Sequence, residues 1–341
     1  MNRFFGYLPD GAPTHLFTLE SRTGLRAEIL DYGGILRSLS FPGRHGRTLL
    51  VLGFENIDAY VGDTAYVGVI AGRYANRIAG AQFNLDGKRW ELSANEGPNH
   101  LHGGRLGLGK RVWRILDCED RPRLRLRLGY HSPDGEEGYP GNLDISAEYT
   151  LSEDELTVAF EATCDAATPV NLTYHPYFNL AGDPAAPLDE QLLTVPADRF
   201  LAISDSFIPT GEIATVNNTP FDFRGGRTLA TSADENCMQL VYAGGYDHCL
   251  LLASDARFSA ELYSELSGIR MQVSSDMPAI QVYGAHWLTT QHPTLGRGIC
   301  LEPQEYPNAP NEPRFPSAIL WPGQRLKRSI RYRFSSTAWR S

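Results

Sequence analysis

The sequence contains little that would indicate a nucleic-acid-binding, membrane or secreted protein. Basic side chains are outnumbered, since 31 Lys and Arg face 40 Asp and Glu and give a formal net charge of -9. A nucleic-acid binder needs Lys and Arg concentrated on one surface. No apolar run approaches the ~18 residues that a membrane helix requires, and the amino-terminal segment lacks the continuous apolar stretch of a secretion signal. We therefore expect no nucleic-acid partner and no membrane association.

Cysteine is scarce and scattered. The five cysteines are odd in number and never form a C-x-x-C pair. Neither a disulfide framework nor a thiolate zinc site is expected from such spacing, and a reducing cytoplasm fits it best.

Apolar stripes with a helical period of 3.6 are missing, whereas alternation with a period of two recurs along the chain. Strands are predicted at residues 124–128, 143–151, 156–162, 269–273, 279–283, 299–302 and 330–334. Only residues 54–60 indicate a short helix. Pro, Gly and Asn separate the strands, so neighbouring strands are expected to form hairpins within antiparallel sheets packed face to face. Without a linker or an internal repeat, residues 1–341 are interpreted as a single domain.

Five segments interrupt the alternation with polar residues that are costly to bury without a purpose. They are residues 71–78, 95–104, 169–180, 245–248 and 300–308. Each has an ordinary structural explanation when taken singly, because Arg73 or Arg77 could form a structural ion pair. In the same way, His175 could be a core histidine and Asp247 could cap a turn. Only the combination of all five points to a functional site.

His100 and His102 raise the question of a metal site. They lie two residues apart, so on a strand both side chains would point to one face and could bind one ion. A metal-binding sandwich of the cupin type would follow them closely with a glutamate, whereas this chain continues with Leu106 and Gly107. We therefore predict no metal site and favour two histidines that hydrogen-bond a hydroxylated ligand.

Glu302 is the strongest candidate for a proton acceptor. It follows apolar residues and precedes Pro303, which favours extended geometry and predicts that the strand ends there, with the carboxylate at the rim of a pocket. A carboxylate partly shielded from water accepts a proton more readily near neutral pH. Glu305 is the competing candidate, but its position in a polar turn predicts that it is solvated or paired with an arginine.

Taken in order, these segments resemble the aldose 1-epimerase (galactose mutarotase) family. The resemblance is carried by Gly72 to Ile78, Asn99 to Gly104, Asn171 to Leu180, Gly245 to His248 and Leu301 to Asn308. It implies one large antiparallel β-sandwich. It also implies an isomerase that interconverts the α and β anomers of hexoses such as D-galactose and D-glucose without a cofactor.

By motif position, the resemblance implies that Glu302 is the catalytic base and His175 the catalytic acid. The substrate-binding residues that it implies are Arg73, Asn76, His102, Asp247 and Gln281. The base would take the proton of the C1 hydroxyl and the acid would protonate the ring oxygen, so the two are expected on different sides of one sugar. His175 protonated and Glu302 ionised is the expected starting pair. The expected partner is an aldose, bound by a monomer or a homodimer.

Two stretches depart from the usual pattern of the family. Residues 284–288 read Gly-Ala-His-Trp-Leu, and residues 173–175 read Thr-Tyr-His. Both leave the acid and the base in place and bear on which sugar is preferred. Two alternatives stay open, namely a sugar-binding sandwich without turnover and an epimerase for another aldose or a sugar phosphate.

Overall fold

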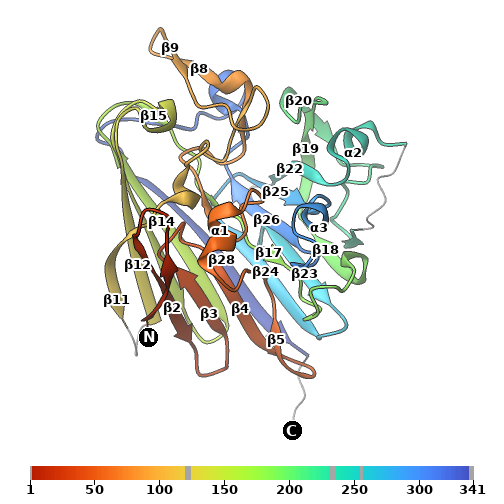
Figure 1. The fold of residues 1–341 in the computed structure, drawn as a ribbon. Helices are drawn as coiled ribbons and strands as arrows, with labels where there is room; N and C mark the ends of the chain where they lie inside the picture. Colours follow the sequence, from red (N-terminus) through yellow and green to blue (C-terminus); the bar gives the residue numbers. More distant parts are fainter. Residues whose placement is uncertain (1, 120–123, 230–235, 254–255, 338–341) are drawn as a thin grey trace.

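Antiparallel β-sheets are the dominant secondary structure of the fold (Figure 1). The computed structural model describes residues 2–119, 124–229, 236–253 and 256–337. Within these residues the strands form sheets of five, nine and six strands together with four two-stranded sheets. The predicted all-β fold class is therefore confirmed.

In the nine-stranded and six-stranded sheets, strands that are neighbours in space often come from distant parts of the sequence, whereas the five-stranded sheet follows the chain order. The five-stranded sheet contains, in spatial order, β1 (Asn2–Tyr7), β2 (Pro13–Glu20), β3 (Arg26–Leu30), β4 (Leu36–Gly43) and β5 (Gly46–Leu49). The nine-stranded sheet contains, in the same sense, β11 (Arg114–Glu119), β12 (Leu124–Ser132), β13 (Leu143–Leu151), β14 (Glu155–Cys164), β28 (Leu326–Ser336), β24 (Ile269–Ser275), β23 (Ala260–Ser264), β18 (Gln191–Thr194) and β21 (Arg227–Thr228). The six-stranded sheet contains β17 (Tyr177–Phe178), β26 (Ile299–Gln304), β25 (Ala279–Tyr283), β22 (Asp247–Leu252), β19 (Ala197–Ile203) and β20 (Pro209–Thr215). The two-stranded sheets pair β6 (Ile70–Ala71) with β16 (Thr173–Tyr174), β7 (Arg77–Ile78) with β10 (His100–Leu101), β8 (Gln82–Leu85) with β9 (Lys88–Glu91), and β15 (Thr168–Pro169) with β27 (Ile319–Leu320).

Helices are short throughout the described part of the chain. The α-helices are α1 (Ile57–Gly62), α2 (Met238–Ala243) and α3 (Leu288–Gln291), and the other helical turns are short 3-10 helices. The helix predicted at 54–60 forms as α1 but begins at Ile57, because the side chain of Asn56 caps it by accepting a hydrogen bond from the backbone N–H of Ala59. No helix of the described residues combines the length and the apolar character needed to cross a membrane.

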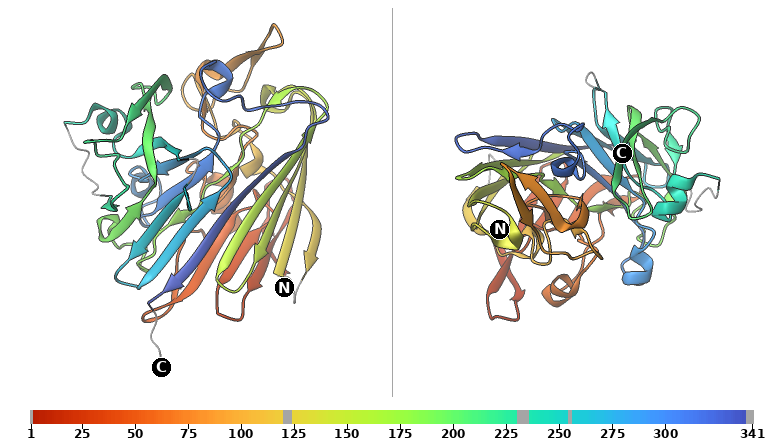
Figure 2. Two further views of the ribbon diagram at one scale, coloured as in Figure 1. Left: turned by 180° about the vertical axis from the view of Figure 1, so that it is seen from behind. Right: turned by 90° about the horizontal axis from the view of Figure 1, so that it is seen from above.

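The nine-stranded sheet forms one long layer, and the five-stranded sheet lies against it (Figure 2). Strand β13 shows why they pack, because its buried residues alternate with exposed or half-buried ones along the whole strand. One face of each strand therefore enters a shared apolar core that reaches from Phe17 to Phe334.

The six-stranded sheet holds three strands side by side that carry predicted site residues. Gln281 of β25 lies opposite Glu302 of β26, and Asp247 of β22 lies opposite Tyr283 of β25. Strand β26 does not end at Glu302 as predicted but continues to Gln304. Strand β17 pairs with β26 only at Ile299 and Cys300 and does not extend to Pro303. Because no β17 residue pairs with Pro303 on that side, the missing N–H of the proline is tolerated.

Candidate active site

A cavity of about 470 Å³ opens beside the six-stranded sheet. The predicted site residues that line it are Asn76, His102, His175, Asp247 and Glu302. They come from segments that are far apart in the sequence and meet where β7, β10, β22, β26 and the end of β16 converge. The other two predicted site residues do not line the cavity. Gln281 donates a hydrogen bond to Asp247, and Arg73 binds the carbonyl oxygen of Gly141.

Glu302 and His175 are direct neighbours in this cavity. The carboxylate oxygen Oε1 of Glu302 lies 3.7 Å from Nε2 of His175, and the two side chains are 2 % and 4 % exposed. The prediction of a carboxylate at the rim is therefore wrong, whereas the placement of the two groups on different sides of one sugar stays a prediction. Because β26 continues past Glu302, this residue lies within the sheet, where neighbouring segments cover it.

Burial dominates the protonation of both groups. It raises the pKa of Glu302 well above its ordinary value, and the charge of Asp247 adds to this rise while Arg77 opposes it. Burial also lowers the pKa of His175 to about 4. Both shifts favour neutral side chains. The directions of the two shifts favour the proton of the pair on Glu302, whereas the sequence led us to expect it on His175.

His102 is held in a defined tautomer. Its Nδ1 accepts a hydrogen bond of 3.2 Å from the backbone N–H of Asn76, and burial lowers its pKa well below the ordinary value. A neutral imidazole that accepts at Nδ1 carries its proton on Nε2. His102 is therefore a hydrogen-bond donor at Nε2.

The same tautomer bears on metal binding. His102, His175 and Glu302 place one donor atom each within 4.8 Å of one another. A histidine that binds a metal through Nε2 must leave that nitrogen unprotonated and usually donates from Nδ1. His102 has the reverse arrangement, so the chemistry of these three donors does not fit a metal ion.

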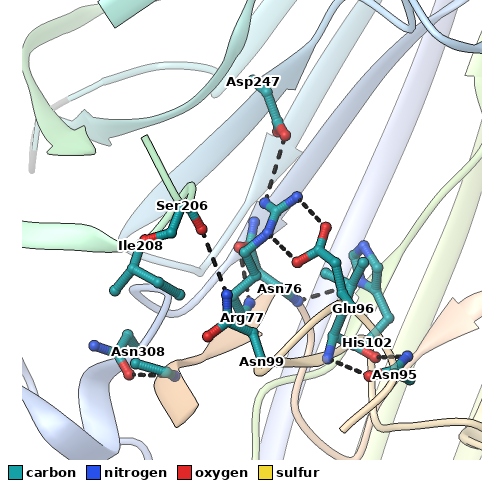
Figure 3. A network of polar contacts seen from close by, with 12 residues as sticks. Asn76, Arg77, Asn95, Glu96, Asn99, His102, Ser206, Ile208, Asp247 and Asn308 are labelled. Carbon is teal, nitrogen blue, oxygen red and sulfur yellow. Dashed lines mark hydrogen bonds and ion pairs between the residues drawn. The ribbon is translucent and has the colours of Figure 1, made fainter. Parts of the chain in front are cut away.

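Arg77 lies at the centre of a polar network along one wall (Figure 3). Its Nε and Nη2 donate to the two carboxylate oxygens of Glu96 at 2.7 and 2.8 Å, and Nη1 lies 3.5 Å from Asp247. Burial alone would lower the pKa of Arg77, but Asp247 and Glu96 raise it above its ordinary value. A charged guanidinium is thus fixed at the cavity between two carboxylates.

Gln281 supports this wall from behind. Its Nε2 donates to Asp247 at 2.6 Å, and its Oε1 accepts from Gln304 at 3.3 Å. The two glutamines therefore orient the carboxylate of Asp247 without reaching the cavity surface themselves.

Arg73 is a correction to the sequence prediction. Its guanidinium donates to the carbonyl oxygens of Ser132, Pro133 and Gly141 at 2.7 to 2.9 Å. These N–H groups therefore bind the turn between β12 and β13 and not a ligand in the cavity. The arginine of residues 71–78 that lines the cavity is Arg77, four residues later. From the sequence, Arg73 and Arg77 were weighed alike as structural ion pairs and only Arg73 was given a binding role, and the available signal for Arg77 was its place next to Asn76 in the same segment.

His100 and Glu305 have structural surroundings. His100 is fully buried, with Nδ1 at 2.7 Å from the carbonyl of Ser93 and Nε2 at 2.7 Å from the hydroxyl of Tyr139. The expected pair of ligand-binding histidines is therefore reduced to His102. Glu305 accepts two hydrogen bonds from Arg328, which confirms that it pairs with an arginine.

Aromatic side chains complete the cavity, and the sequence patterns did not single them out. The rings that line it are Tyr66, Tyr177, Phe207, Tyr283 and Trp287. Tyr66 packs on His102 with ring centres 4.6 Å apart. Four lining residues other than glycine have a left-handed backbone, with φ between 50° and 63° at Tyr66, Asn76, His102 and Phe207. Such conformations are costly and tend to occur at functional sites.

Comparison with known proteins agrees with this geometry. Residues 15–333 match the family described as aldose 1-epimerase. The chain is 39% identical to the galactose mutarotase of Bos taurus and 37% identical to that of Homo sapiens, each over 97% of both chains. It is 33% identical to the aldose 1-epimerase of Escherichia coli over 96% of both chains.

Solved structures show the same fold. The aldose epimerase homologue from C. elegans superposes with a TM-score of 0.86 at 32% identity, covering 95% of this chain and 99% of that one. Galactose 1-epimerase from Lactobacillus acidophilus gives a TM-score of 0.87 at 27% identity, with 98% and 99% covered. The chain therefore belongs to the aldose 1-epimerase family and is an isomerase.

Proposed function

We propose that this isomerase interconverts the α and β anomers of hexoses such as D-galactose and D-glucose by acid and base catalysis. The observation that carries the proposal is the contact of 3.7 Å between Glu302 and His175 inside a cavity rich in hydrogen-bonding groups. The relatives named galactose mutarotase support the choice of sugar.

The reaction needs one proton shared by the pair. When that proton moves from Glu302 to Nε2 of His175, the carboxylate can accept the proton of the C1 hydroxyl while the imidazolium protonates the ring oxygen. The bond between C1 and the ring oxygen breaks and leaves a free aldehyde. Because both oxygens are attached to C1, a base and an acid that are neighbours can reach them together. Positioned groups of this kind typically contribute ~10²–10⁴-fold each.

Ring closure reverses these transfers after rotation about the C1–C2 bond. His175 takes back the proton of the C5 hydroxyl, which becomes the ring oxygen, and Glu302 returns a proton to the carbonyl oxygen. The pair then holds one proton again and is ready for the next sugar. No electron or group is transferred, so these steps require no cofactor.

Binding would use the fixed donors and acceptors of the walls. His102 offers a donor at Nε2, Arg77 a cation, and Asp247 a carboxylate held by Gln281. A site that hydrogen-bonds specific hydroxyls rejects analogues that lack them strongly. Asn76 would act mainly through its backbone N–H, which holds His102.

The alternatives are less well supported. Of the cations at the cavity, Lys110 donates to the carbonyl oxygens of Tyr60, Val61 and Asp63, and Arg77 is paired with Glu96; Arg105 is the exposed cation that a sugar phosphate could use. A sugar-binding protein without turnover would not need Glu302 and His175 buried in contact with pKa values shifted in opposite directions.

Polarimetry of freshly dissolved α-D-galactose and α-D-glucose tests the proposal. We expect Glu302→Gln to lose at least ~10²-fold in kcat, because the base is removed while the shape is kept. Glu305→Gln is the matched control, since this carboxylate lies on the same segment but pairs with Arg328.

An unchanged rate in Glu302→Gln, with or without an effect of Glu305→Gln, would contradict the assignment of the base. A wild-type protein that binds both sugars without accelerating their equilibration would instead favour the sugar-binding alternative.

A further inference from the structure

The imidazole of His175 lies between two side chains of one strand. Glu302 and Cys300 are separated by two positions on β26, so both point to the same face of that strand. Glu302 faces Nε2 of the ring at 3.7 Å, and the sulfur of Cys300 lies 3.5 Å from Nδ1 at the opposite edge. Two side chains of one strand therefore face the two ring nitrogens of His175.

Cys300 is the side-chain partner that the structure gives to Nδ1. The thiol is fully buried, and burial raises its pKa well above the ordinary value, so it stays protonated. The remaining ring contacts are aromatic, with His102 at 5.2 Å and Tyr177 at 5.1 Å between ring centres. A backbone hydrogen bond of His175 also acts on its ring and raises the pKa, and the carbonyl of His175 accepts the backbone N–H of Gly68 as well.

The tautomer of His175 decides whether the pair can exchange its proton. The pKa shifts favour the proton of the pair on Glu302, so in the proposed reaction Nε2 must have a free lone pair to receive it. That requires a proton on Nδ1, which then needs an acceptor beside it. The sulfur of Cys300 is the side-chain atom in that position.

We propose that Cys300 is a positioning residue whose sulfur accepts a hydrogen bond from Nδ1–H of His175 and thereby presents Nε2 as the proton-accepting nitrogen to Glu302. This inference rests on the proposed function of the pair and goes beyond it, since it assigns the opposite tautomer to each histidine of the cavity. His102 donates from Nε2, whereas His175 accepts there.

A sulfur partner also explains why His175 is a strong acid once protonated. Thiol sulfur is a weak acceptor, whereas a carboxylate at Nδ1 stabilises an imidazolium and raises its basicity. Burial lowers the pKa of His175 to about 4, although a backbone hydrogen bond at His175 itself and the charges of Asp63 and Asp247 raise it, and a weak thiol acceptor at Nδ1 does not offset the burial. The imidazolium therefore releases its proton readily to a ring oxygen, which is itself a weak base.

The tautomer can be measured without relying on catalysis. We expect NMR of protein labelled with ¹⁵N-histidine to show His175 protonated at Nδ1 and unprotonated at Nε2 at pH 7, with His175→Asn used to assign the signals. Cys300→Ser should keep this tautomer, because a hydroxyl also accepts, and Cys300→Ala should give a mixture. Protonation at Nε2 in the wild type would overturn the proposal.

Kinetics provide the second measurement. For Cys300→Ala we expect kcat to fall about tenfold with KM changed less than about twofold, because substrate contacts are kept while the acid is misaligned. Cys300→Ser should recover most of kcat and move the acid limb of the kcat/KM profile to higher pH, since a hydroxyl is the stronger acceptor. Cys164→Ala is the control, because this half-buried thiol bonds to the carbonyl of Leu320 and leaves His175 untouched.

The outcomes separate the two proposals. If the wild type lacks mutarotase activity, the proposed function fails while the NMR result still decides the role of Cys300. If the wild type is active and Cys300→Ala changes only the melting temperature, with tautomer and acid limb unaltered, Cys300 serves packing and the inference is wrong.

Discussion

At the scale of single residues, surroundings rather than residue type decide what each side chain can do. His100, His102 and His175 are all buried and all have lowered pKa values. His100 is held between a carbonyl and a tyrosine hydroxyl in the core, whereas the other two reach the cavity. The same contrast separates Glu302, whose Oε2 has no partner, from Glu305, which is paired with Arg328.

The two arginines of one segment give a prediction at this scale. Arg77→Ala should raise KM for galactose at least about tenfold, because a cavity cation that fixes Glu96 and Asp247 is lost. Arg73→Ala should instead lower the free energy of unfolding by about 2–4 kcal/mol, since several buried carbonyls lose their donor. Polarimetry and urea unfolding of both variants check this. An Arg73→Ala protein with wild-type stability and a raised KM would restore the original prediction for Arg73.

At the scale of elements, strand β26 places the base, whereas the proposed acid His175 directly follows the short strand β16. Strand β26 carries Cys300 and Glu302, and its pairing with β25 sets Gln281 beside Glu302. His102 and Tyr66 lie instead in irregular segments with a left-handed backbone. Their positions depend on close approaches of one loop to another, which are less tolerant of substitution than strand ladders.

Two glycines of the segment that carries His102 test this difference. Gly103 has φ of 88°, and a Cβ there would lie 1.7 Å from the carbonyl oxygen of Gly72. Gly103→Ala should therefore cost about 3 kcal/mol or more and displace His102. Gly97 also has positive φ, but nothing lies within 4 Å of its Cβ position, so Gly97→Ala should cost only about 1 kcal/mol. Equal melting temperatures for the two variants would contradict this explanation.

At the scale of the whole molecule, one apolar core joins the first sheet to the last strand. Its members run from Phe17 to Phe334 and include residues of all three large sheets. We propose on this ground that residues 1–341 fold as a single domain. The same core encloses polar groups, and their titration links folding to pH.

Buried neutral histidines predict a loss of stability in acid. The pKa values of His100 and His248 are lowered to about 4 by burial, while an unfolded chain protonates histidine near pH ~6.5. The unfolded state therefore binds more protons between these values, and stability falls as the pH drops from 6.5 toward 4. Each histidine should cost about 2 kcal/mol between pH 7 and pH 5.

Urea unfolding at both pH values measures this cost, and His248→Phe provides the comparison. This variant should lose about 2 kcal/mol less than the wild type between pH 7 and pH 5, because Nε2 of His248 has no partner and its ring packs on Phe221. An identical pH dependence in both proteins would show that His248 does not contribute.

The sequence alone determined the β architecture and most candidate residues. Alternation in 143–151 matches strand β13 residue for residue, since side chains that alternate in polarity suit a backbone whose side chains alternate in direction. The ordered polar segments indicated the family, which the comparisons confirm. Glu302, His175, His102 and Asp247 were named from those segments, and all four line the cavity.

Only the tertiary structure decided which arginine of residues 71–78 lines the cavity, how deeply Glu302 is buried, and which atoms contact each ring nitrogen of the histidines. Local sequence specifies backbone geometry and the side of a strand on which a residue lies. It does not specify which segment, more than a hundred residues away, will cover that side. The pKa values of Glu302 and His175 depend on the segments that cover them. Packing removes water from both groups and brings Asp247 and Arg77 near Glu302 and Cys300 near His175.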